Sequence, residues 1–185
     1  LMAVKEAVDN SLDACEEARI LPEVSVEIIE MSEFKYKVVV EDNGQGIVKK
    51  QIPNIFAKLL YGSKFHTLKQ ARGQQGIGIS AAVLYSQLTT GKPAKITSRV
   101  SKKEPAFYYE LQIDTQTNKP VIAKEEIVQW AKEHGTKVEI DLEAEYLKGN
   151  QSVDEYIKQT AVINPHVPII STNPKSEQVI YARAT

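Results

Sequence analysis

The chain has 185 residues, with 23 Lys and Arg against 24 Asp and Glu, so its formal net charge is −1. That length suits one domain, or one domain with a short extension, and 42% hydrophobic residues are enough for a buried core. The single cysteine, Cys15, excludes a disulfide framework and a cysteine-based zinc site. No apolar run approaches the roughly 20 residues of a membrane span, and no signal-peptide pattern is present. We therefore expect a soluble protein from a reducing, intracellular setting. Because Leu1 already lies in an expected helix, we also expect a fragment of a longer protein.

The secondary structure expected from periodicity and turn residues mixes helices and strands. In the first half of the chain we expect a helix over 2–18, a hairpin of strands over 24–30 and 36–41, a short helix over 53–61 and a polar stretch over 62–75. A helix over 79–88, strands over 94–100 and 107–113, a helix over 125–133 and a strand over 136–142 should follow. The last expected helix runs from 153 toward 163, and a capping box at 152–155 opens it. The proline-containing tail after Asn164 is expected to be a linker or a sheet edge. The mixture predicts an α+β fold with one mixed or antiparallel sheet and helices packed on one face.

The near-zero net charge hides a strong segregation of charges along the chain. Residues 1–42 hold 4 basic and 11 acidic side chains, and residues 104–185 hold 8 basic and 13 acidic ones. Between them, residues 43–103 hold 11 basic side chains and no acidic one. Such a segment indicates an anionic partner, either phosphate or nucleic acid, although a solvated lysine-rich surface is an equally good interpretation.

The first cluster with chemical potential lies on the opening helix. Glu6, Asn10 and Asp13 follow one another at helical spacing and so share one side of the helix. A carboxylate one turn from a carboxamide can polarise a water molecule while the amide oxygen holds a hard cation. The alternative is the ordinary polar face of an amphipathic helix.

The second cluster, Asp42-Asn-Gly44-Gln-Gly46, follows the strand expected over 36–41. Glycines there make a turn without Cβ atoms, against which a flat ring could lie. An ionised carboxylate only accepts hydrogen bonds, so Asp42 would select a donor such as the amino group of adenine. A glycine-rich turn that merely closes a strand is the alternative.

The third cluster is a GxxGxG pattern, Gly73 to Gly78, that leads directly into the helix expected over 79–88. Unpaired N–H groups and the positive end of the helix dipole would suit phosphate oxygens at this place. The spacing differs from the GxGxxG of Rossmann folds, and the chain has no Walker A motif. Glycines needed only for close helix packing are the alternative.

The order of these clusters, followed by Gly135-Thr136 at the start of a late strand, resembles the Bergerat (GHKL) ATP-binding fold. Gyrase B, heat-shock chaperones, sensor histidine kinases and MutL share this fold. The resemblance covers residues 1 to about 142 and implies a two-layer sandwich. Within the superfamily, three stretches are similar to the B subunits of archaeal DNA topoisomerase VI, a type IIB topoisomerase: residues 7–14, 59–64 and 76–87. Residues 156–160 and 164–166 are similar to the segment that closes the ATPase domain of that family.

The resemblance implies a role for each cluster. Glu6 would be the general base, Asn10 the Mg²⁺ ligand with Asp13 nearby at the nucleotide, and Asp42 the reader of the adenine amino group. Gly44 and Gly46 would lie beneath the ring, with Thr136 near the base through water. The remaining residues implied at the nucleotide are Ser63 and Lys64 of a lid, and Gly73, Gln74, Gln75, Gly76, Ile77, Gly78, Ile79 and Ser80 around the phosphates.

The resemblance also implies partners and a division of the chain. Residues 1–150 would form the ATP-binding domain, and 151–185 a closing helix and linker toward a helix–two-turn–helix module. Two B subunits would join two A subunits, which carry the DNA-cleaving tyrosine, and ATP would close the B subunits into a dimer that gates duplex DNA. The setting would be the archaeal cytoplasm, at the nucleoid, with no membrane partner. A lysine beyond this chain would contact the γ-phosphate, so we expect the isolated chain to bind nucleotide weakly and hydrolyse it very slowly.

The alternatives are a MutL-like or gyrase-B-like ATPase, a non-catalytic nucleotide-gated binding module, and a basic middle segment that binds DNA directly.

Overall fold

A computed structural model describes residues 2–18, 23–59, 78–143, 153–164 and 166–182. Four α-helices and one 3-10 helix are seen there: α1 (Met2–Ala18), η1 (Lys49–Gln51), α2 (Ile52–Phe56), α4 (Ile79–Thr90) and α5 (Val153–Ile163). The strands are β1 (Val24–Ser32), β2 (Lys35–Asp42), β3 (Ala94–Arg99), β4 (Ala106–Asp114), β5 (Lys119–Val128), β6 (Gly135–Glu143), β7 (Ile169–Thr172) and β8 (Gln178–Tyr181).

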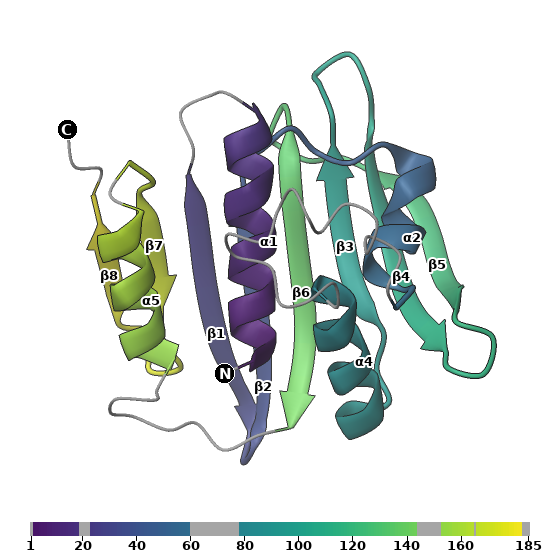
Figure 1. Cartoon of the computed structure of the whole chain (residues 1–185), viewed down its shortest axis with the longest axis horizontal. Helices are drawn as coiled ribbons and strands as arrows, with labels where there is room; N and C mark the ends of the chain where they lie inside the picture. The colour runs from purple at the N-terminus through teal and green to yellow at the C-terminus, as the bar shows by residue number, and fades with distance from the viewer. Residues whose placement is uncertain (1, 19–22, 60–77, 144–152, 165, 183–185) are drawn as a thin grey trace.

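The strands form one sheet in the order β5-β4-β3-β6-β2-β1-β7-β8. Neighbouring strands run antiparallel, except for β1 and β7, which are parallel. The helices α1, α2, α4 and α5 all lie on the same face of this sheet (Figure 1). The predicted α+β sandwich with a mostly antiparallel mixed sheet is therefore confirmed.

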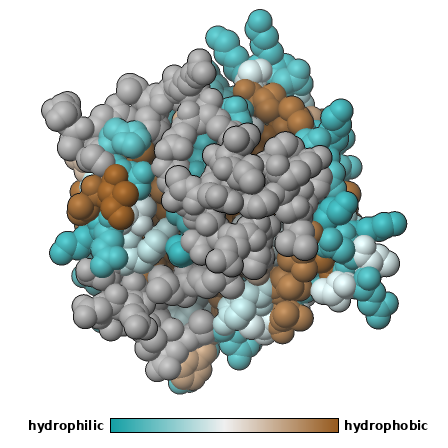
Figure 2. Space-filling view, in the orientation of Figure 1, coloured by the Kyte–Doolittle hydropathy of each residue, from teal (hydrophilic) through white to brown (hydrophobic). Residues whose placement is uncertain are grey.

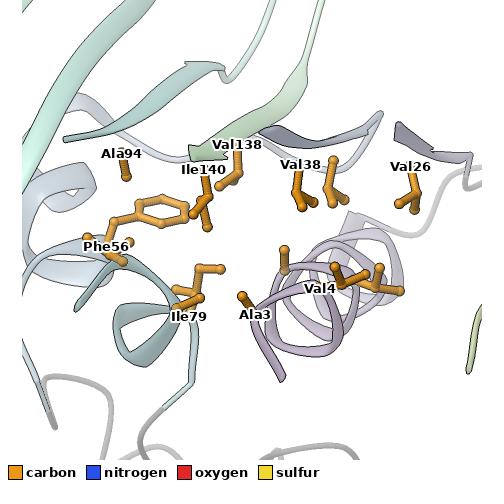
Figure 3. Packing of buried hydrophobic residues seen from close by; sticks show 14 of the residues in the cluster. Ala3, Val4, Val26, Val38, Phe56, Ile79, Ala94, Val138 and Ile140 are labelled. Atoms are coloured by element: carbon orange, nitrogen blue, oxygen red, sulfur yellow. The ribbon is translucent and has the colours of Figure 1, made fainter. Parts of the chain in front are cut away.

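The core lies between this sheet face and the helices, as the alternation of apolar residues in the strands requires. Val40, Val138 and Ile96 are register partners on β2, β6 and β3, and each is at most 1% exposed. Side chains of α1, such as Ala3 and Val4, point toward the strands (Figure 3). The apolar face expected for residues 2–18 is thus what attaches α1 to the sheet.

One predicted element is wrong: the helix over 125–133. Residues up to Val128 belong to β5, which pairs with the outer edge of β4. Beyond it, the carbonyls of Trp130 and Lys132 accept hydrogen bonds from Arg99 Nη1, at 3.4 and 3.2 Å, instead of closing helical turns. The local preference of an Ala-Lys-Glu-Glu sequence for helix is weak, and pairing with a strand that would otherwise have an open edge overrides it.

The tail is a sheet edge rather than a linker, because β7 pairs with β1 and β8 pairs with β7. The predicted helix from 153 to 163 is confirmed as α5, and the Tyr156 hydroxyl donates to Asp9 Oδ1 of α1 at 3.3 Å. Ser152 of the expected capping box lies outside the described residues, as do residues 60–61 of the short helix. The domain boundary at residue 150 stays a prediction.

The helix-bearing face carries hydrophobic and hydrophilic residues in separate small groups (Figure 2). Within the described ranges, no helix is both long and apolar enough to cross a bilayer.

Candidate nucleotide-binding site

The centre of the site is a row of three polar side chains fixed by sheet register. Asp42 at the end of β2 pairs with Thr136 at the start of β6, and Thr136 pairs with Ser98 near the end of β3. Register partners on adjacent strands point to the same face of a sheet. These three residues continue the apolar row of Val40, Val138 and Ile96 by two positions, so they lie on the helix-covered face. All three are at most 2% exposed.

Asp42 has one carboxylate oxygen satisfied and one not. Its Oδ1 accepts the Gly44 N–H at 2.8 Å, whereas its Oδ2 is fully buried and has no hydrogen-bond partner within the described structure. Burial raises the pKa of Asp42, and the Gly44 amide lowers it in part. The Ser11 hydroxyl on α1 lies close enough to favour the ionised form without reaching hydrogen-bond geometry. A buried acceptor without a partner is costly, so this oxygen calls for a donor from a ligand.

The glycines after Asp42 have a packing role that the sequence does not reveal. A Cβ on Gly44 would lie 2.9 Å from Ala14 Cβ of α1, so the loop passes directly against the helix. Gly46 has φ +74°, and a Cβ there would lie 2.0 Å from the Arg99 carbonyl oxygen. The turn that closes a strand, weighed as an alternative from the sequence, is therefore real at both positions. A position beneath an adenine ring stays a prediction for Gly44 and Gly46.

Three further contacts hold this loop, and sequence reasoning missed them. The Asn43 side-chain oxygen accepts the Glu23 N–H at 2.7 Å and lies 3.7 Å from the Cys15 thiol. His134 Nδ1 lies 2.8 Å from the Gly44 carbonyl oxygen, so this histidine helps to hold the loop. The loop is thereby tied to α1, to the start of β1 and to the segment before β6.

Ser98 is the second feature that the sequence did not indicate. Its hydroxyl accepts the Ile47 N–H at 2.9 Å, donates to the Gly135 carbonyl at 3.0 Å and lies 2.9 Å from Thr136 Oγ1. One buried hydroxyl therefore links the loop after β2 to the beginning of β6. A serine inside a strand has no sequence signature that would separate it from an ordinary polar residue.

The cluster on α1 lies partly inside the protein. Glu6 is 6% exposed, which excludes the solvent-facing alternative for this side chain, while Asn10 and Asp13 are half-buried. Burial raises the pKa of Glu6, the charge of Asp9 adds to the effect, and Lys5 opposes it. The helix packs against both β2 and α4, so Glu6 lies on an element that contacts both the strand that ends in Asp42 and the helix that Gly78 caps. A buried carboxylate with a raised pKa is a stronger proton acceptor than an exposed one, which suits a general base.

The phosphate-binding pattern is described only at its end. Gly78 caps the N-terminus of α4 with φ 62° and ψ −149°, a conformation open essentially to glycine alone, and a Cβ there would meet no atom of the described residues within 4 Å. Ile79 and Ser80 begin the helix and are buried. The other predicted residues of the lid and the pattern lie outside the described part of the chain: Ser63, Lys64, Gly73, Gln74, Gln75, Gly76 and Ile77.

No preformed metal cage is visible in the part of the chain that the structure describes, since no three His, Cys, Asp or Glu side chains gather there. Asn10 offers a single half-buried amide oxygen. Mg²⁺ is commonly bound through one or two protein oxygens together with substrate phosphates, so this donor set fits an ion that arrives with a nucleotide.

Residues 1–144 match the family model described as "Histidine kinase-, DNA gyrase B-, and HSP90-like ATPase". The chain belongs to this family, and the predicted superfamily is confirmed. A solved structure of the Aquifex aeolicus MutL ATPase domain complexed with ADP has the same fold, with a TM-score of 0.60 and 22% identity over 98% of this chain and 62% of that chain.

More similar sequences narrow the relationship within the family. The B subunit of the type 2 DNA topoisomerase 6 of Methanococcoides burtonii is 55% identical over the whole chain, and that of Archaeoglobus fulgidus is 50% identical over the whole chain. The Natronomonas pharaonis protein of the same name is 56% identical over 94% of the chain. The chain spans 30%, 31% and 21% of the length of these three relatives, respectively. The resemblance to archaeal B subunits is therefore confirmed along the chain.

Proposed function

We propose that this chain is the ATP-binding and ATP-hydrolysing domain of the B subunit of an ATP-dependent type II DNA topoisomerase. The observation that carries the nucleotide part is the buried Asp42 Oδ2, which lacks a hydrogen-bond partner in the described structure. The identity of 50–56% to proteins named as B subunits of topoisomerase 6 supports the remainder.

The adenine amino group would donate to Asp42 Oδ2, and the Thr136 hydroxyl would meet the base directly or through water. Both groups are rigidly held, because Asp42 is fixed by the Gly44 amide and Thr136 by Ser98. A preorganised acceptor loses little entropy on binding, which favours affinity. This part of the site would therefore decide which base is accepted.

Glu6 would take the proton of the water that attacks the γ-phosphate. The carboxylate is buried and its pKa is raised, so it is a better proton acceptor than an exposed glutamate. Asn10, one helical turn away, would supply an amide oxygen to Mg²⁺, with Asp13 a further turn along the helix. When bound, the ion would neutralise charge on the phosphates. The phosphates themselves would lie at the N-terminus of α4, which Gly78, Ile79 and Ser80 form, with Ser63, Lys64 and residues 73–77 completing the enclosure.

In the whole protein, ATP binding would bring two B subunits together, and hydrolysis would release them. Coupled to A subunits that cleave DNA, this cycle would pass one duplex through another, relaxing supercoils and separating linked circles. A MutL-like or gyrase-B-like role shares the nucleotide site but not these partners. Co-purification of the full-length protein with an A subunit, followed by ATP-dependent decatenation, separates the two.

The test of the chemical step is Glu6→Gln in the full-length protein assembled with its A subunit. Glutamine keeps the size and polarity of the side chain but cannot accept the proton. We expect binding of a non-hydrolysable ATP analogue to change by less than about threefold, while hydrolysis falls by roughly 10²–10⁴-fold. Strand passage should fail with it.

Glu27→Gln provides the matched control, because Glu27 is an exposed glutamate on β1. Its ATPase rate should equal that of the wild type. Unchanged hydrolysis in Glu6→Gln would refute Glu6 as the base, and absence of any adenine nucleotide binding by the wild type would refute the proposed function.

A further inference from the structure

The Ser98 hydroxyl has a hydrogen-bond arrangement that leaves only one assignment of protons. A hydroxyl has one proton to donate and two lone pairs to accept with. The Gly135 carbonyl can only accept, so it takes the Ser98 proton at 3.0 Å. The Ile47 N–H can only donate, so it occupies one Ser98 lone pair at 2.9 Å.

The third contact, 2.9 Å between Ser98 Oγ and Thr136 Oγ1, is decided by elimination. Ser98 has no second proton to give, so Thr136 must donate to the remaining lone pair of Ser98. Thr136 has one hydroxyl proton as well, and this contact uses it. Toward any ligand or water that reaches it, the Thr136 hydroxyl can then act only as an acceptor.

Thr136 and Asp42 are direct register partners on β6 and β2, so their side chains lie next to each other on one face. Asp42 Oδ2 is an acceptor without a partner in the described structure. Where the base edge meets both groups directly, without a bridging water, two adjacent acceptors favour an edge that presents N–H donors. A 6-amino purine presents two N–H bonds there, whereas a 6-oxo purine presents a carbonyl oxygen that would face acceptors only.

We propose that Ser98 is a positioning residue for base selection. Because the Ser98 hydroxyl accepts the hydrogen bond from Thr136, Thr136 and Asp42 can both only accept hydrogen bonds from a ligand. This pair of acceptors then prefers 6-amino over 6-oxo purine nucleotides. This inference rests on the proposed nucleotide site. It goes beyond it by assigning the direction of the Thr136 hydrogen bond to a residue that need not touch the nucleotide.

The test compares non-hydrolysable ATP and ITP analogues on the full-length protein, with Kd measured by calorimetry for each. The readout is the Kd of the ITP analogue divided by the Kd of the ATP analogue, so a high ratio means a strong preference for adenine. Ser98→Ala frees the Thr136 proton, which can then rotate toward the base and donate to a 6-oxo group. We expect the preference for adenine to fall by about tenfold, the size of one net hydrogen bond. Ser98→Thr keeps the hydroxyl and should restore the wild-type ratio.

Two further variants separate base selection from ordinary stabilisation. Ser86→Ala removes another fully buried serine hydroxyl, on α4, that has no partner in the described structure, and it should leave the ratio unchanged. Thr136→Val removes the acceptor itself with little change in shape. It should lower the ratio, and adding Ser98→Ala to it should lower the ratio no further.

Equal weakening of both nucleotides in Ser98→Ala would overturn the proposal, because it would show a structural role alone. If Ser98→Ala does not fold, the Thr136→Val ratio decides: an unchanged ratio also overturns it. If Asp42→Asn loses adenine binding but Ser98→Ala leaves the ratio of the two Kd values unchanged, this inference is wrong and the proposed function still stands. No binding of either analogue by the wild type would instead sink the proposed function.

Discussion

The two ends of the proposed nucleotide site are built in different ways. At the base end, Asp42, Thr136 and Ser98 are neighbours across three strands, and their positions follow from sheet register. At the phosphate end, Glu6 and Asn10 lie on α1, and Gly78 lies at the N-terminus of α4, so their positions depend on how two helices pack. The geometry of the base end is therefore set by the sheet, and that of the phosphate end by the packing of two helices.

The glycines show the same contrast. Gly46 and Gly135, at the base end, are places where backbone meets backbone: added Cβ atoms would lie 2.0 Å from the Arg99 carbonyl oxygen and 2.2 Å from the Asp42 carbonyl oxygen. At Gly78, at the phosphate end, an added Cβ would meet no atom of the described residues within 4 Å. Close packing at the base end suits a site that recognises one base.

Gly46→Ala should have the largest effect on stability. Its Cβ would meet a backbone oxygen that cannot move without disturbing β3, and φ +74° disfavours alanine as well. We expect a loss of roughly 4 kcal/mol or more in the free energy of unfolding, measured by urea denaturation.

Gly91→Ala is the matched control, since Gly91 has φ +72° but no atom of the described part of the chain within 4 Å of an added Cβ. Its cost should be about 1–2 kcal/mol, from the left-handed backbone alone. Similar losses in the two variants would contradict the close packing inferred for the base end.

Asp42→Asn should weaken adenine nucleotide binding by about 10- to 100-fold, the range for a hydrogen bond to a charged group. The new amide N–H₂ would face the amino group of adenine, donor against donor. The same substitution should stabilise the folded state, because the amide carries no charge that must be buried. Burial raises the pKa of Asp42 above its ordinary value of 3.8, so the folded state resists ionisation.

The pH dependence follows from linkage. The ionised carboxylate opposes folding above the raised pKa, and this penalty disappears below pH 3.8. The wild type should therefore lose stability as the pH rises from about 3.8 through the raised pKa, and Asp42→Asn should lose less over the same window. Parallel stability curves for the two proteins would contradict the burial of this charge.

The prediction for Cys15 concerns the reactivity of its thiol alone. The thiol is 2% exposed, and burial, with the nearby Asp42 charge, raises its pKa from 9.0 to about 11. At pH 8 a thiol reagent should label the folded protein at least about 100-fold more slowly than the protein in guanidinium, because the thiolate is the reactive form. Asp42→Asn should speed labelling modestly. Equal rates in folded and unfolded protein would show that α1 does not hold the loop after β2 as described.

Most elements were predictable because their patterns are local. The apolar face of residues 2–18 and the alternation in 24–30 and 36–41 each require one partner surface, whatever that surface is. The conformation of the segment 125–133 was not predictable, because it depends on the open edge of β4 and on Arg99, both distant in sequence. The role of Ser98 could not be predicted for the same reason, because its three hydrogen-bond partners lie 37 to 51 residues away in the sequence.

By itself, the sequence determined the two-layer α+β fold, the order of the three motifs and their likeness to the archaeal B subunits. These depend on side-chain periodicity and on residue types at short spacing. Only the tertiary structure decided that Asp42 Oδ2 is buried without a partner among the described residues, that Gly44 and Gly46 are required by packing, and that the Ser98 and Thr136 hydroxyls lie 2.9 Å apart. Each of these depends on which strands become neighbours and in which register, and that is a property of the whole sheet rather than of any one segment.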